Sequence, residues 1–298
     1  MAAAPVLYGV GATKAGTSWL YRALAGHPGC ALKAVKELHY WDTFGADERA
    51  KQVAAFRARL AEFRAGQALA EAEGLGWQAA NMARRAADME GLLAVVEGDR
   101  AGDARYAAYL TDGAEGRLVA DITPNYAVLP DETLARMAGA LPGAKVLYLI
   151  RDPLARLWSH VRMQAQRFRQ AHEVFEEKAN NILWRILHRG QETHILARGD
   201  YPGTVARLRR AVPRDRLRVE YCEAMFTAPG WTALQAWLGI ELRPADGGEV
   251  AHEGPRATLR DDLRAKAVRL LRDHYDWAAR EVGPLPPAWQ ATLERALA

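Results

Sequence analysis

The chain has 298 residues, of which 50% are hydrophobic and 26% are charged, and this balance excludes disordered and fibrous proteins. Lys and Arg number 40 against 36 acidic residues, a net charge of +4. That excess is too small for a general nucleic-acid binder but fits a local basic site for a small anion. No apolar run approaches the ~18–20 residues of a membrane span. We therefore expect a soluble, cytoplasmic protein with Cys30 and Cys222 as free thiols.

The first part of the chain predicts a strand, a loop and a helix in succession. An apolar run over 6–10 predicts the strand, the loop 11–18 contains two glycines, and apolar residues at helical spacing follow from Trp19. A second short strand is expected over 30–32, and the segment 36–42 after it is expected to be a loop. This order places a glycine-containing loop between a buried strand and the start of a helix.

Residues 46–98 differ from their surroundings, since they are rich in Ala, Arg and Glu and have few β-branched residues. Phe56, Leu60, Met89 and Leu92 stand at helical spacing, which predicts two or three helices whose apolar stripe packs into the core. Because this block stands between two predicted strands, we expect a helical insertion that forms a lid or cap over a site.

The rest of the chain alternates between predicted strands and helices. Strands are expected over 118–122, 144–150 and 217–220, and the second of these is a continuous apolar run of the buried parallel type. The predicted helices cover 131–140, 153–170, 173–188, 203–211, 229–238, 259–281 and 287–297, and the irregular stretch 243–257 is expected to be a flexible loop.

Strands that alternate with helices favour an α/β fold. We expect a P-loop-like three-layer sandwich with a central, mostly parallel sheet of about five strands. The chain shows no repeat and no low-complexity linker, so we expect a single domain over 1–298 that carries the helical insertion 46–98. In such folds, ligands bind beyond the carboxyl ends of the strands.

The loop 11–18 has the features of a phosphate-binding loop with a displaced lysine. Gly11 and Gly16 have the separation found in a Walker A loop, but Thr17 and Ser18 follow where Lys and Ser or Thr are usual. The lysine stands within the loop, at Lys14. Backbone N–H groups and the helix dipole still favour an anion at such a helix start. The loop is therefore predicted to bind a phosphate-like group beside Lys14.

Residues 13–20 resemble the phosphosulfate-binding loop of sulfotransferases that use 3′-phosphoadenosine 5′-phosphosulfate (PAPS). Arg151 and Ser159, separated by eight positions, match the second motif of that family. The resemblance implies that PAPS is the co-substrate, that no metal is required, and that Arg151 and Ser159 hold the 3′-phosphate. Arg256 stands in the place of a further cofactor loop of the family. The implied cofactor-binding residues are Lys14, Ala15, Gly16, Thr17, Ser18, Trp19, Arg151, Ser159 and Arg256.

The segment 36–42 resembles a Glu-x-His-Phe-Phe-Asp segment of the heparan-sulfate type of sulfotransferase. The resemblance implies that Glu37 is the general base and that His39 and Asp42 lie near the acceptor. A glutamate can accept the proton of a hydroxyl if its site is dry and its pKa is raised. His39 is the next candidate for the base, because its usual pKa is near neutrality.

The segment 121–126 resembles a Glu-Lys-[ST]-Pro-x-Tyr segment of the same family. Asp121 and Tyr126 match its acidic and aromatic positions, and the resemblance places both on the acceptor side of the site. Ile122 stands where the family has Lys, which weakens the case for a polyanionic acceptor.

These patterns predict an enzyme that moves a sulfuryl group from PAPS to a hydroxyl of a small-molecule or carbohydrate acceptor. Carbohydrates, lipids, phenols and small alcohols all remain open as acceptors. One alternative is a P-loop-type kinase that uses ATP and Mg²⁺, against which the displaced Lys14 argues. The other is a non-catalytic nucleotide-binding protein with the same fold, against which the presence of Glu37 together with Lys14 argues. We expect no nucleic-acid partner and no metal site.

Overall fold

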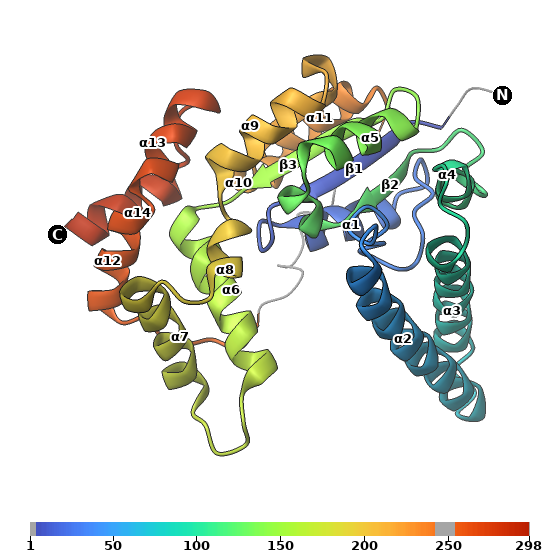
Figure 1. The fold of residues 1–298 in the computed structure, drawn as a ribbon, viewed down its shortest axis with the longest axis horizontal. Helices are drawn as coiled ribbons and strands as arrows, with labels where there is room; N and C mark the ends of the chain where they lie inside the picture. Colours follow the sequence, from blue (N-terminus) through green and yellow to red (C-terminus); the bar gives the residue numbers. More distant parts are fainter. Residues whose placement is uncertain (1–3, 242–253, 298) are drawn as a thin grey trace.

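A parallel sheet of four strands, in the order β2-β1-β3-β4, forms the centre of the protein (Figure 1). The computed structural model describes residues 4–241 and 254–297. All five residues from Val146 to Ile150 in the third strand are buried, as the continuous apolar run predicted. The strands are β1 (Val6–Gly11), β2 (Val119–Ile122), β3 (Lys145–Ile150) and β4 (Leu217–Tyr221).

The expectation of about five strands is wrong for the described residues, which form four. The segment 30–32 makes only an isolated bridge between Cys30 and Leu118. The amide of Ala31 donates to the carbonyl of Leu118, whose own amide donates to the carbonyl of Gly29. The ladder stops there because the chain turns away toward the loop 36–42.

Helices cover both faces of the sheet, which gives the expected three layers (Figure 1). The chain moves from β1 outward to β2 and then back past β1 to β3. Because such crossovers are right-handed, the connecting helices α1 (Thr17–Ala25) and α5 (Asp131–Ala140) lie on opposite faces. The helix α9 (Tyr201–Ala211), which precedes β4, packs beside α5.

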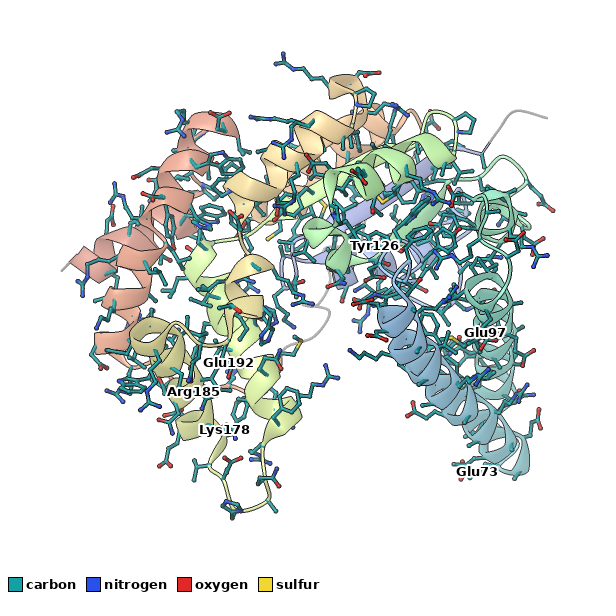
Figure 2. All side chains as sticks on the ribbon, viewed as in Figure 1. Glu73, Glu97, Tyr126, Lys178, Arg185 and Glu192 are labelled. Atoms are coloured by element: carbon teal, nitrogen blue, oxygen red, sulfur yellow. The ribbon has the colours of Figure 1, made fainter. Side chains whose placement is uncertain are left out.

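The block 46–98 forms two helices, as predicted. The helices α2 (Ala46–Ala72) and α3 (Gly76–Glu97) pack along each other and project from the sheet as a hairpin. Glu73 lies at the far tip of this hairpin (Figure 2). The predicted apolar stripe is the packed face, since Phe56 and Met89 are fully buried. The short helix α4 then leads back to β2.

The helix α6 (Pro153–Phe168) follows the carboxyl end of β3. The side chain of Asp152 caps this helix by accepting a hydrogen bond from the amide of Ala155. The expected helix over 259–281 is two helices that meet at Leu271. The expected flexible loop 243–257 lies outside the described residues as far as residue 253. The remaining elements are α4 (Ala104–Thr111), η1 (Pro124–Val128), α7 (Phe175–Arg189), α8 (Thr193–Ala197), η2 (Arg214–Arg216), α10 (Cys222–Met225), α11 (Ala228–Leu238), α12 (Asp261–Leu270), α13 (Arg272–Glu281) and α14 (Pro287–Leu297).

The two cysteines, Cys30 and Cys222, are buried and free, as expected. Across the stretches 4–241 and 254–297, no helix combines the length and the apolar character that crossing a membrane requires.

Candidate active site

A cavity of about 1000 Å³ lies beyond the carboxyl ends of the strands. Each strand contributes a residue just after its end: Lys14 follows β1, Asn125 follows β2, Arg151 follows β3 and Glu223 follows β4. Residues from four separate parts of the chain therefore meet at the edge where α/β folds bind ligands. The hairpin reaches this cavity only through Gln52, on the first turns of α2.

The loop after β1 presents the amino end of α1 to the cavity. Gly16 is the residue before this helix, with a φ of 85° that favours glycine. A Cβ atom on Gly16 would lie 2.7 Å from the ring of Phe226, so that ring would have to shift to admit a side chain there. The first amides of the helix lack intrahelical acceptors, and both Thr17 and Ser18 line the cavity. This end of α1 suits an anion.

Lys14 lies in the same loop and lines the cavity. Its φ is 72°, an unusual backbone conformation for a residue with a side chain. Partial burial lowers the pKa of its amino group, and the nearby Arg151, Arg162 and Lys36 lower it further. Three cations therefore lie near Lys14, and the carboxylate of Glu37 opposes their effect on its pKa. An anionic ligand would relieve the repulsion among these groups.

Arg151 joins the two motifs in space, as the sequence predicted from their positions after β1 and β3. Its Nη1 donates to the carbonyl oxygen of Lys14 over 3.3 Å. The hydroxyl of Tyr201 donates to the carbonyl of Arg151 over 2.7 Å and holds the backbone at this turn. Ser159, on α6, lines the same cavity and a smaller adjoining one of about 320 Å³. The structure thus brings Lys14, Arg151 and Ser159 together.

Three further predicted cofactor residues lie around this region. Trp19 lines the cavity and packs against Phe226, with ring centroids 4.7 Å apart. Ala15 is fully buried within the loop. Arg256 is exposed, and its neighbours Gly254 and Pro255 line the smaller cavity beside Ser159. A contact between Arg256 and a 3′-phosphate stays a prediction.

Glu37 and His39 project into the cavity from the loop after α1. Their φ values are 65° and 50°, and the buried Leu38 between them anchors the loop. Of the five residues other than glycine with positive φ that the structure describes, three are Lys14, Glu37 and His39. Such strained conformations cluster at functional sites, and all three residues line the cavity; their catalytic roles stay predictions.

The carboxylate of Glu37 lies between two basic groups. The Nζ of Lys36 donates to Oε1 over 2.5 Å, and the Nε2 of His39 is 3.8 Å from Oε2. Burial raises the pKa of Glu37, but the nearby imidazole of His39 and the charge of Lys36 outweigh it and lower this pKa to about 2. The expectation that the base has a raised pKa is therefore wrong for this arrangement. The sequence could not show that both neighbours turn toward Glu37.

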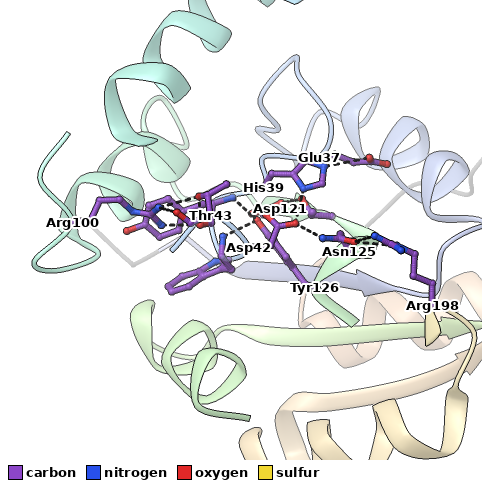
Figure 3. A network of polar contacts seen from close by, with 12 residues as sticks. Glu37, His39, Asp42, Thr43, Arg100, Asp121, Asn125, Tyr126 and Arg198 are labelled. Carbon is purple, nitrogen blue, oxygen red and sulfur yellow. Dashed lines mark hydrogen bonds and ion pairs between the residues drawn. The ribbon is translucent and has the colours of Figure 1, made fainter. Parts of the chain in front are cut away.

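A chain of polar contacts runs from His39 to α8 (Figure 3). The Nδ1 of His39 donates to Oδ2 of Asp42 over 2.7 Å, and the amide of Asn125 donates to the same oxygen over 2.5 Å. Arg198 in turn donates to Oδ1 of Asn125 through two of its nitrogens. Burial lowers the pKa of His39, but the hydrogen bond to Asp42 and the nearby carboxylate of Glu37 outweigh it and raise this pKa to about 9. His39 is therefore an imidazolium at neutral pH.

Asp121 and Tyr126, predicted on the acceptor side, are fully buried and lie behind the cavity wall. The hydroxyl of Tyr126 donates a hydrogen bond to Asp121 over 2.8 Å and accepts one from the backbone amide of Tyr40 over 2.9 Å. Thr123 also donates to Asp121. These contacts fix the segment 36–42 to the end of β2, so Asp121 and Tyr126 position the loop of Glu37 and do not face an acceptor.

Two residues of this wall were not predicted from the sequence, Asn125 and Arg198. Asn125 stands inside the segment 121–126 that was singled out, so its position was indicated but its contact was not. Arg198 stands next to Gly199, and its partner Asn125 is 73 residues away in the chain. A single sequence holds no signal for a contact over that separation.

Comparisons with known proteins identify the family and the fold. Residues 5–242 match the profile of a family described as "Sulfotransferase family". The fold is similar to that of a sulfotransferase from Alicyclobacillus acidocaldarius, with a TM-score of 0.59, 20% identity, and coverage of 97% of this chain and 100% of that one. A sulfotransferase domain from the curacin biosynthetic pathway gives a TM-score of 0.46 and 17% identity over 99% of this chain and 97% of that one. No curated protein matches the chain. With its profile match extending over most of its length, the chain belongs to the sulfotransferase family.

Proposed function

We propose that this protein transfers the sulfuryl group of PAPS to a hydroxyl oxygen of an acceptor, which gives PAP and a sulfate ester. One observation carries the proposal: the cationic, anion-binding loop of Lys14 and the carboxylate of Glu37 face the same cavity. A donor site and a proton acceptor in one cavity are the two parts that such a transfer needs.

On the donor side, the first amides of α1 and the hydroxyls of Thr17 and Ser18 bind the 5′-phosphate. Arg151 and Ser159 bind the 3′-phosphate, with the forked guanidinium of Arg151 matched to its oxygens. Lys14 lies beside the bridging oxygen and stabilises the negative charge that develops there as the S–O bond to the phosphate breaks.

On the acceptor side, the hydroxyl oxygen attacks sulfur and its proton passes to Glu37. A carboxylate with a pKa of about 2 is a weak base toward a free alcohol. Once the new S–O bond forms, however, the attacking oxygen becomes strongly acidic, so Glu37 needs only to accept the proton late in the step. His39, held as an imidazolium by Asp42, orients Glu37 and keeps it ionised.

The test is transfer of ³⁵S from labelled PAPS over an acceptor panel of carbohydrates, phenols, lipids and small alcohols, with and without EDTA. We expect labelled product that is insensitive to EDTA and is lost in Lys14→Ala. Phosphate transfer from ATP that EDTA abolishes would instead assign the protein to the kinases. Absence of any transfer, together with normal PAP binding, would leave a nucleotide-binding protein without this activity.

A further inference from the structure

Arg198 is a half-buried cation on the wall of the cavity, and its contacts are to neutral groups. Its Nε and Nη2 donate to Oδ1 of Asn125 over 3.1 and 2.8 Å, and its Nη1 donates to the carbonyl of His194 over 3.3 Å. A guanidinium has five N–H groups, so these three bonds leave two for another acceptor. Figure 3 shows the guanidinium of Arg198 directed toward Asn125, with its Nε and Nη2 atoms as the two donors.

The nearest carboxylate in this network, Asp42, lies on the other side of the Asn125 amide. Its Oδ2 atom already accepts hydrogen bonds from His39 and Asn125. Some arginines of the described chain pair directly with acids, as Arg136 does with Asp103 through two bonds, whereas Arg198 hydrogen bonds to a side-chain amide and a backbone carbonyl. Partial burial of a guanidinium without a direct counterion is unfavourable. Arg198 is therefore suited to an anion that enters the cavity.

One atom of a second polar side chain, Gln164, lacks a hydrogen-bond partner in the described part of the chain. Gln164, on α6, lines the cavity, and its Nε2 lies 2.9 Å from Nε2 of His194. Its Oε1 is buried without a hydrogen-bond partner within the described residues. The two ends of a side-chain amide are interchangeable in assignment, so one end of Gln164 needs a partner in either orientation.

We infer that the acceptor is a hydroxy acid, whose carboxylate is bound by Arg198 and whose hydroxyl receives the sulfuryl group at Glu37. This inference rests on the proposed function. Arg198 and Glu37 both line the cavity, and contacts through Asn125, Asp42 and His39 connect them, so both groups face the space that the acceptor occupies. A second hydroxyl or an amide on that molecule would satisfy Gln164. The carboxylate takes no part in the chemical step, and the proton of the sulfated hydroxyl passes to Glu37 as before.

The experiment uses matched acceptor pairs that differ only in charge: 4-hydroxybenzoate with 4-hydroxybenzamide, and 3-hydroxybutyrate with 3-hydroxybutyramide. Label transfer from ³⁵S-PAPS gives kcat/KM for each compound. We expect the acid of at least one pair to exceed its amide by about 10- to 100-fold, the range of a charge-assisted hydrogen bond. In Arg198→Met this preference falls to near parity, whereas Arg198→Lys keeps part of it.

Arg209→Met is the matched control, because Arg209 is an exposed arginine that pairs with Glu281 and does not line the cavity. It should keep the wild-type preference. Equal or faster transfer to the amides, or transfer to neutral acceptors and to no acid, overturns the inference while the proposed function stands. If Arg198→Met keeps the preference for the acid, the carboxylate binds elsewhere and the inference is equally wrong. Failure of the proposed function is seen separately, as absence of both PAP binding and transfer to any acceptor.

Discussion

Replacement of Asp42 by Asn tests the electrostatics of the site most sharply. Asp42 accepts the 2.7 Å bond from His39, and this bond is the largest of the effects that raise the pKa of His39 from 6.5 to about 9. At 1.36 kcal/mol per pKa unit, the increase corresponds to about 3 kcal/mol in favour of the imidazolium. Asn keeps the shape of Asp42 but removes its charge. The pKa of His39 should then fall by at least about one unit.

The assay is a pH titration of the His39 ring protons by NMR, with assignment by comparison with His39→Asn. The same shift should appear in stability. Because the folded-state pKa lies above the unfolded value, His39 stabilises the fold fully below pH 6.5, and this stabilisation is lost as the pH rises through about 9. Wild type should therefore lose unfolding free energy between pH 6.5 and 10, and Asp42→Asn should lose less over that range.

Asp131→Asn is the control, since Asp131 is an exposed carboxylate on α5 that pairs with Arg210 of α9 and does not line the cavity. It should leave the titration of His39 unchanged. A pKa of His39 near 6.5 in the wild type would refute the reasoning, because the ring would then be neutral beside Glu37. An unchanged pKa in Asp42→Asn would show that Glu37 alone holds the proton.

Four other substitutions test the remaining roles. Glu37→Gln should lower kcat by roughly 10²–10⁴-fold in single-turnover assays, with PAP affinity unchanged, and a wild-type rate in this variant would exclude Glu37 as the base. Because the pKa of Glu37 is low, the activity of the wild type should not begin to fall near pH 4.5 as the pH is lowered. Arg151→Ala and Ser159→Ala should each weaken PAP binding in calorimetry, by about 1.5–3 kcal/mol for the charge-assisted contact, and unchanged affinity would remove them from the donor site. Gly16→Ala should lower the free energy of unfolding by about 1–2 kcal/mol in chemical denaturation, because the φ of this residue is 85°. It should also weaken PAP binding, since the new Cβ meets the ring of Phe226. An unchanged free energy of unfolding would contradict the strain argument.

The donor side of the site could be predicted from the sequence because local order determines it. An apolar strand, two glycines and a helix start place Lys14 at the carboxyl edge, and a second buried strand places Arg151 beside it. The 3.3 Å bond between Arg151 and the Lys14 carbonyl confirms that the two motifs meet. The helices of the block 46–98 were equally predictable, because their apolar spacing is regular.

The acceptor side could be predicted only in part, because distant contacts determine it. The motif in the segment 36–42 was enough to single out Glu37, but the low pKa of Glu37 depends on how Lys36 and His39 turn toward it. Asp121 and Tyr126 stand in the expected segment, yet they hydrogen bond to each other behind the wall. Burial of a polar side chain depends on what packs over it, and no local pattern in one sequence records that.

Binding of PAP and of adenosine 5′-phosphate by calorimetry tests the central claim most directly, since it needs no knowledge of the acceptor. The two ligands differ only in the 3′-phosphate that Arg151 and Ser159 are proposed to hold. We predict that PAP binds at least about tenfold more tightly than adenosine 5′-phosphate and that Arg151→Ala removes most of the difference. Equal affinities of the wild type for the two ligands would contradict the account.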